Sequence, residues 1–367
     1  SLSLVGRGKY FFNLSKTKSL LALGRVKDAS NQQINLKTES GIDSKNPLGA
    51  FESIVLRTAI LNILGEPIVQ DHYREINAFY ISYIKQTFNR LSETERENFY
   101  NKFSNYFASF QNYALLHPEM IPDLINLRIE TKSILLNMSN VIKRRILASG
   151  DKALIDLYDE VQVLKQEIEQ LSETQSEPVS SKADSLRAII NSKDQQLSKY
   201  ASYYSNDQTQ HKWEDIQARL NKNEAAVEII RVQGYDFYKL KETDSVFYAA
   251  LIITPKTKKQ PDLVLLGNGN ELENKILNGY RNSIYYKTKN SSAYDHYWRP
   301  IKDALKKVET VYFSPDGAYN LLNLSTLYNE EEDRFLFDET NIVTLTSMKD
   351  LLAEKRPEMP YNSSILI

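Results

Sequence analysis

Four histidines are the first residues that could carry acid–base or metal chemistry: His72, His117, His211 and His296. None lies three or four residues from another, so the spacing of a helical zinc site is missing. His211, close to Trp213, and His296, within the run Tyr294-Asp295-His296-Tyr297-Trp298, could each line a groove. Composition leaves a Ser/His/Asp triad open, but the sequence supplies no evident partner nucleophile and no Gly-x-Ser-x-Gly elbow. We therefore expect each histidine to be a surface or capping residue.

A glycine-containing turn, Gly267-Asn268-Gly269, follows an expected strand and precedes an expected helix. Phosphate-binding turns occupy this position, but a third glycine and a Walker-type lysine are missing, so an ordinary turn is favoured. Lys256, Lys258 and Lys259 would form the basic tip of a hairpin. Because the net charge is only −1, we expect this tip to be a solvated loop and not a nucleic-acid surface.

Carboxylates occur at two further places of interest. Asp316 lies in Ser314-Pro315-Asp316-Gly317, where it could be a catalytic carboxylate or part of a tight turn. Pro presets φ, Asp bonds its own backbone and Gly accepts positive φ, so Ser314 and Asp316 are expected to be scaffold residues. Glu330 to Asp333 are expected to form a solvated, mobile acidic loop, with contact to basic substrate residues as the alternative. The sequence thus indicates no catalytic, cofactor-binding or metal-binding residue.

Composition limits the chemistry further. The chain has no cysteine, which excludes disulfides, thiolate metal sites and a cysteine nucleophile within it. Its 367 residues, 41% hydrophobic and 25% charged, are typical of a soluble protein with two domains or one domain with a large extension. No apolar run approaches the ~20 residues that span a bilayer, and no signal-peptide core is present. We expect a cytoplasmic protein with no membrane partner, although Ser1 is not a start methionine and leaves room for an upstream segment.

The elements that must position these residues begin with helices. Residues 1–50 are expected to form an N-terminal segment with one helix near residues 14–26 and a loop or disordered stretch over 31–46. Residues 51–221 show helical periodicity, with a capping box at Ser92-Glu93-Thr94-Glu95 and a heptad seam from Leu154 to Leu171. Helices are expected over residues 51–64, 73–91, 92–110, 123–148, 154–171 and 186–204, with an exposed loop near 174–184. The Phe99 to Phe110 aromatic face is expected to be core, or a docking surface if exposed.

After Asn223 the pattern changes from helix to alternating strands and helices. Strands are expected over residues 227–232, 246–254, 263–266, 311–313 and 342–345, and helices over 271–280 and 293–308. This alternation predicts an α/β sheet in residues 222–367 behind the helical region.

An ordered set of motifs runs through this second part. They are WEDIQ at 213–217 with Leu220, EAAVE at 224–228, SPDG at 314–317 before a leucine-rich patch, and TSMKDLL at 346–352. In this order they resemble the N-terminal half of a CHAT domain, including its WxDVQxxL helix and EAAIE strand. CHAT domains are caspase-like cysteine peptidase domains that usually follow tetratricopeptide-type helical repeats. The resemblance covers about Trp213 to Ile367, and more loosely the helices from Phe51 to Leu171, although no strict 34-residue repeat is found.

The resemblance implies a helical, TPR-like region followed by the first part of a caspase-like α/β domain. It also implies a cytoplasmic bacterial protein whose helices bind a partner and whose peptidase half cuts a protein substrate. Such systems occur in antiviral defence, including ones whose substrate is a gasdermin-like pore former. A CHAT peptidase works through a His/Cys pair in its second half, which this sequence does not reach. The final run Ser364 to Ile367 resembles a strand cut in its middle, so we expect one fragment of a longer protein without peptidase activity of its own.

Two other hypotheses stay open from the sequence. The chain could be a non-enzymatic interaction scaffold, with helices and a degenerate α/β domain whose catalytic half has been lost. It could also be a nucleotide-binding α/β protein, an interpretation that depends on the Gly267 turn alone. No cofactor is expected if the chain is the peptidase fragment or the scaffold. The expected partner is then a protein or the missing catalytic half.

Overall fold

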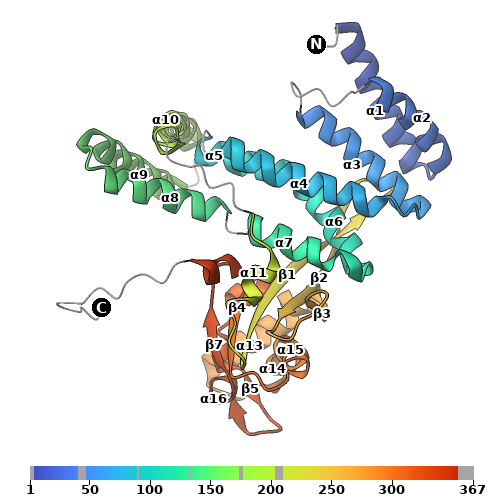
Figure 1. Ribbon diagram of the computed structural model, residues 1–367. Helices are drawn as coiled ribbons and strands as arrows, with labels where there is room; N and C mark the ends of the chain where they lie inside the picture. Colours follow the sequence, from blue (N-terminus) through green and yellow to red (C-terminus); the bar gives the residue numbers. More distant parts are fainter. Residues whose placement is uncertain are drawn as a thin grey trace. The chain divides into compact units, whose positions relative to one another are not determined.

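The computed structural model of the protein describes residues 4–39, 47–88, 91–132, 134–172, 177–202 and 210–353 (Figure 1). The chain divides into two compact units. Unit 1 comprises residues 1–210 with 232–245, and unit 2 comprises 211–231 with 246–367. Unit 1 is helical apart from one strand-hairpin end, and unit 2 contains most of a mixed five-stranded sheet with its helices. The expected fold class, helices followed by an α/β sheet, is confirmed at this level.

Unit 1 contains ten α-helices among its described residues. Their bounds are α1 (Leu4–Ala22), α2 (Val26–Glu39), α3 (Pro47–Leu64), α4 (Val69–Thr87), α5 (Glu93–Lys102), α6 (Ser104–Leu116), α7 (Ile121–Thr131), α8 (Ile134–Ser149), α9 (Lys152–Ser172) and α10 (Glu177–Ser202). The expected loop over residues 31–46 is wrong for 31–39, which continue α2. The expected loop near 174–184 is wrong from Glu177 onward, where α10 begins, and residues 173–176 lie outside the described part. Both predictions relied on the polar composition of these segments. They failed because a solvent-facing helix needs few apolar residues.

The start of α5 was predicted from four residues and is confirmed. The Ser92 hydroxyl accepts from the Glu95 amide at 3.2 Å, and the Glu95 carboxylate accepts from the Ser92 amide at 2.8 Å. The single expected helix over 92–110 is instead two, because Phe103 leaves helical geometry at φ −100° and ψ 0°. Its aromatic face is buried as expected, with Phe103 and Phe110 at most 1% exposed.

The helices after Pro118 differ from expectation in the same way. The expected helix over 123–148 is interrupted at Lys132, whose ψ of 134° is extended, so that α7 and α8 are separate. The predicted seam of α9 is confirmed: Val161 is fully buried, and Leu157 and Leu164 pack beside it. This seam meets α8 and α10 together, and so makes a three-helix cluster in place of the expected helix pair.

The main sheet has the strand order β3-β2-β1-β4-β7. Its strands are β1 (Glu224–Asp236), β2 (Lys241–Ile253), β3 (Asp262–Asn268), β4 (Thr310–Ser314) and β7 (Asn341–Thr344). β4 pairs in parallel with both β1 and β7, while β3 pairs antiparallel with β2. A second, two-stranded antiparallel sheet joins β5 (Tyr328–Asn329) and β6 (Arg334–Phe335).

The hairpin formed by β1 and β2 passes from one unit into the other. Its end, residues 232–245, belongs to unit 1, where the Asn112 side-chain amide of α6 donates to the Gln233 carbonyl at 2.7 Å. Leu240 at the hairpin turn packs on the apolar cluster of α1, α2 and α3. Both strands are longer than expected, because their polar outer ends carry no hydrophobic alternation.

Unit 2 completes the sheet with short helices. They are α11 (Trp213–Gln217), α12 (Gly269–Glu271) with a π-turn over Leu272–Ile276, α13 (Leu277–Tyr286), α14 (Ser291–Tyr297), α15 (Arg299–Ala304) and α16 (Leu336–Glu339). 3₁₀ turns lie over Gly317–Leu321, Leu324–Thr326 and Met348–Leu352.

Two helix predictions in unit 2 need correction. The expected helix over 293–308 is broken at Trp298, because Pro300 has no N–H for a continuous helix and instead lies in the first turn of α15. The helix expected to end at Tyr280 runs on to Tyr286.

One apolar core holds unit 2 together. It joins inward residues of β1, β2, β4 and their neighbours, such as Val227, Tyr248 and Phe313, to helix residues such as Tyr297 and Trp298. All five are at most 1% exposed. Among the helices that the structure describes, none is long and apolar enough to cross a membrane.

Candidate functional site

The SPDG turn lies at the carboxyl end of β4, the middle strand of the parallel part of the sheet. Asp316 caps the 3₁₀ turn that follows, and its Oδ1 accepts from the Gly317 amide at 2.9 Å. Its Oδ2 accepts from the Arg231 amide of β1 at 3.3 Å. Ligands of open α/β sheets bind at this edge, so the turn is the first candidate site.

Three side chains from different elements hold this turn. Arg231 of β1 binds Glu273 of the π-turn with two nitrogens, at 2.5 and 3.2 Å. The Tyr248 hydroxyl of β2 donates to Glu273 Oε1 at 2.7 Å and accepts from the Ala318 amide at 2.8 Å. Each polar group therefore has a partner within the turn or its supports, which is the arrangement of a scaffold.

The electrostatics of this group also favour fixed charges. Burial alone would raise the pKa of Glu273, but the Arg231 and Tyr248 hydrogen bonds outweigh it and leave the pKa below its usual range. The hydrogen bond to Glu273 raises the pKa of Arg231. Burial raises the pKa of the Tyr248 hydroxyl well above its usual range. At neutral pH the pair is ionised and the tyrosine neutral, so none of the three is poised to exchange protons.

Gly317 explains why the turn needs its glycine. Its φ is +52°, and a Cβ at this position would lie 1.9 Å from the Tyr248 hydroxyl oxygen. A side chain would therefore be strained by the backbone and excluded by Tyr248. The scaffold interpretation of Ser314 and Asp316 fits these contacts, and Ser314 itself is fully buried.

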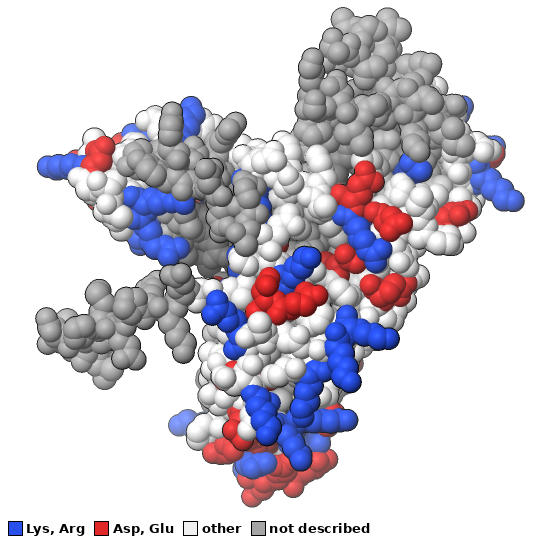
Figure 2. All heavy atoms as spheres, viewed as in Figure 1, with Lys and Arg blue, Asp and Glu red and all other residues white. Residues whose placement is uncertain are grey.

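The acidic segment Glu330–Asp333 is exposed to solvent as expected, but its carboxylates are paired. Each of its four carboxylates has its own donor from residues 289–302: Ser291 for Glu330 (2.8 Å), Arg299 for Glu331 (2.8 Å), Lys302 for Glu332 (2.7 Å) and Lys289 for Asp333 (2.6 Å). Figure 2 shows acidic and basic side chains next to one another over the end of unit 2 that carries α14, α16 and β5. The sequence suggested a solvated loop because the donors are 30 to 44 residues away.

A buried carboxylate lies beneath this segment. The Glu339 side chain is 3% exposed and accepts from Tyr294 and Asn329 at 2.8 Å, with Lys302 also at 2.8 Å. Lys302 therefore joins the inner Glu339 to the outer Glu332. Burial opposes the charge of Lys302, but the hydrogen bonds to the two glutamates and Tyr294 raise its pKa above the usual range.

The glycine-containing segment 267–269 and the basic hairpin tip, which were also considered as sites, have structural surroundings. Asn268, between the two glycines, caps α12 by accepting from the amides of Asn270 and Glu271 at 2.9 and 3.4 Å. The separate turn expected at Gly267–Gly269 does not form, because Gly267 and Asn268 end β3 and Gly269 begins α12. Lys256 and Lys259 are exposed at the loop after β2, as expected for a solvated tip.

The histidines follow the prediction only in part. His72 is 8% exposed on the inner face of α4, so the expectation of a surface residue is wrong there. His117 caps the end of α6 with its ring stacked 4.0 Å from Tyr113, and His296 is exposed with Nδ1 2.7 Å from the Ser292 carbonyl. Within the described part of the chain, no group of three or more potential ligands could hold a metal ion.

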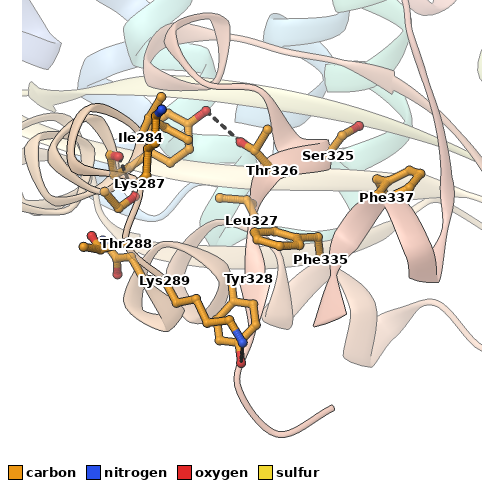
Figure 3. A pocket seen from close by; sticks show the side chains of 13 residues that line it. Ile284, Lys287, Thr288, Lys289, Ser325, Thr326, Leu327, Tyr328, Phe335 and Phe337 are labelled. Atoms are coloured by element: carbon orange, nitrogen blue, oxygen red, sulfur yellow. Dashed lines mark hydrogen bonds between the residues drawn. The ribbon is translucent and has the colours of Figure 1, made fainter. Parts of the chain in front are cut away.

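A pocket that the sequence did not indicate lies between α13, the segment 287–290 and the β5–β6 sheet (Figure 3). The only available sequence signal was an Ile-Tyr-Tyr run followed by Lys-Thr-Lys-Asn at 284–290. Neither run is a recognised motif. The pocket could not be recognised from them, because its other wall comes from residues 325–337.

Comparison with known proteins gives no further constraint. The chain matches no model of a protein family and no curated protein. Any function must therefore be argued from the residues and their geometry.

Proposed function

We propose that this chain is the helical regulatory region and the non-catalytic first half of a CHAT-type, caspase-like cysteine endopeptidase that cleaves a protein substrate. In this proposal the helices of unit 1 are the repeat-like region that binds a protein partner. Unit 2 is the first part of the peptidase domain. The cysteine and histidine of the reaction would come from sequence beyond the 367 residues, since the chain has no cysteine.

The observation that carries the proposal is the SPDG turn at the carboxyl end of a central parallel strand. The four motifs that suggested the family also fall on separate elements: WEDIQ forms α11, EAAVE opens β1, SPDG ends β4, and TSMKDLL forms the last 3₁₀ turn. β7 is the outermost strand on the parallel side of the described sheet. A further parallel strand could pair there, and catalytic residues of α/β sheets lie at the carboxyl ends of such strands.

This chain's own contribution to the reaction would be positional. The Arg231–Glu273–Tyr248 group would keep the β4 turn fixed beside the reacting residues. The cysteine thiolate supplied by the second half would attack the scissile carbonyl, and the histidine would protonate the leaving amine. A scaffold made of already paired groups suits this role because it need not reorganise during the reaction.

The test compares two proteins with a library of fluorogenic peptides. The chain alone should give no turnover, and the chain extended by its downstream reading frame should give turnover that a Cys→Ala substitution abolishes. Turnover by the chain alone would refute the proposal. A downstream frame without a cysteine and a histidine would also refute it, in favour of the non-enzymatic scaffold.

A second experiment separates a scaffold role of Asp316 from a catalytic one in the extended protein. Asp316→Asn should lower the urea midpoint of unit 2 while the folded fraction keeps most of its kcat. Loss of kcat at unchanged stability would instead make Asp316 part of the chemistry.

A further inference from the structure

The pocket in unit 2 has a volume of about 570 Å³ and walls from four segments. Such a volume lies within the range of specific ligand sites, roughly 300–1,000 Å³. Its walls come from α13, the segment 287–290, residues 325–328 and the β6–α16 segment. In Figure 3 Lys289 extends toward the ring of Tyr328, and Phe335 lies across from that ring.

The apolar part of this pocket is open to solvent. Ile284 is 50% exposed, Phe335 40% and Phe337 67%. Three large apolar side chains around one opening leave a surface whose covering by an apolar ligand group lowers the free energy. An apolar ligand group is therefore favoured at the mouth.

The inner polar groups of the pocket are already paired. The hydroxyls of Tyr280 and Thr326 lie 3.0 Å apart, and Tyr280 also accepts from the Asn323 amide at 3.0 Å. These groups form a fixed wall that offers little to a ligand. Recognition of a polar ligand group must come from the rim.

The rim carries two lysines in different states. Lys289 is bound to Asp333 at 2.6 Å and to the Tyr328 hydroxyl at 2.9 Å, but lysine and aspartate are 59% and 77% exposed. An exposed pair of this kind stabilises the fold little, so an incoming carboxylate can replace Asp333. Lys287 is exposed, and within the described part of the chain it has no ion pair or side-chain hydrogen bond.

Lys287 also has an unusual backbone conformation. It ends α13 in the left-handed region, with φ 53° and ψ 44°. Glycine is favoured at this capping position, and any other residue is strained there. The stability of the fold therefore gains nothing from a lysine here.

The ligand that fits this place is elongated. A second hollow of about 440 Å³ shares Ser283, Thr288, Lys289 and Asn290 with the first and continues toward Tyr286. Both hollows border the segment 287–290, and we call them together the groove. A compact small molecule would fill only one part, whereas a short peptide would follow both.

We propose that this groove binds a short peptide segment of a partner protein, with one large apolar side chain in the pocket and a neighbouring carboxylate on Lys287 and Lys289. Glu330 and Asp333 near the rim disfavour the continuous negative charge of a nucleic acid. The proposed site is independent of the peptidase assignment, because all its residues are in the present chain.

The test uses a phage-displayed random heptapeptide library selected on the full chain. Bound phage should be enriched in peptides that place Asp or Glu within two residues of Phe, Leu, Ile or Trp. The best peptide is then synthesised with a fluorescent label, and its Kd is measured by polarisation at two salt concentrations. The affinity should fall at higher salt because one contact is ionic.

Two variants and a matched control locate the site. Lys287→Gly should weaken binding about tenfold, as expected for loss of a charge-assisted hydrogen bond, while relieving backbone strain and raising thermal stability. Lys307→Gly changes another exposed lysine with positive φ (57°) and should raise stability without changing the Kd. Phe337→Ser, at an exposed position, should weaken binding about fivefold with little effect on folding.

The proposal is overturned if the library yields no enrichment, or enriches peptides without carboxylates. It is also overturned if Lys287→Gly and Lys307→Gly have the same effect on the Kd, because the peptide would then bind elsewhere. A tight Kd that is unchanged by both Lys287→Gly and Phe337→Ser leads to the same conclusion.

Discussion

Substituting Gly317 with alanine tests whether close packing at the SPDG turn fixes the sheet. The added Cβ would lie 1.9 Å from the Tyr248 hydroxyl oxygen and 2.9 Å from Arg231 Cδ. Either the turn or the tyrosine must move. Because the Tyr248 hydroxyl links Glu273 to the Ala318 amide, moving it breaks two hydrogen bonds at once.

The size of the effect follows from two contributions. An alanine at φ +52° costs about 1–2 kcal/mol in backbone strain. Displacing a buried hydroxyl from its partners costs another ~1–3 kcal/mol. We therefore expect Gly317→Ala to lower the free energy of unfolding of unit 2 by about 3 kcal/mol.

Tryptophan fluorescence during urea unfolding measures this change in unit 2. The chain has two tryptophans, Trp213 and Trp298, which are 3% and 1% exposed and both lie in unit 2. Gly267→Ala is the matched control, because Gly267 has φ +93° but no atom within 4 Å of an added Cβ. It should cost the backbone strain alone, about 1–2 kcal/mol.

Equal losses for Gly317→Ala and Gly267→Ala would refute the packing argument and leave backbone strain as the whole cause. A double-mutant cycle with Tyr248→Phe adds a second check. Without the hydroxyl oxygen, part of the clash is absent, so Gly317→Ala should cost less than in the parent. An unchanged cost would show that Tyr248 does not exclude the side chain.

Three further predictions concern the caps and charges. Ser92→Ala removes the cap of α5 and should destabilise unit 1 by about 1 kcal/mol. Far-UV circular dichroism in urea measures this change. Retained hydrogen-exchange protection at the start of α5 would contradict the prediction. Glu273 has a lowered pKa, so its stabilisation is present above the unfolded pKa of about 4.3 and lost as the pH falls through the folded value. The urea midpoint of the parent should thus fall more between pH 6 and 3 than that of Glu273→Gln, and parallel curves would count against the pair. Glu339→Gln should lower the free energy of unfolding by about 2 kcal/mol. The exposed Glu332→Gln should lower it by less than ~1 kcal/mol, although both glutamates contact Lys302. Fluorescence-detected unfolding measures both changes, and the inverse order would contradict the prediction.

Local sequence signals predicted much of the fold where one segment contains all the interacting groups. The Ser92–Glu95 capping box depends on residues within a few positions, and it formed as expected. Helix breaks were missed at Phe103, Lys132 and Trp298, because periodicity continues across a bend that tertiary packing imposes.

The sequence by itself determined the type of most main elements, the lack of a cysteine nucleophile and the turn at Ser314–Gly317, since these depend on composition and on neighbouring residues. Only the tertiary structure decided that Glu273 meets Arg231 across 42 positions, and that Lys289 meets Asp333 across 44. The groove beside Lys287 belongs to the same class, because its walls come from segments about 40 residues apart. The physical reason is that charge pairs and cavities form between surfaces, whose positions are fixed only when the sheet and its helices pack together.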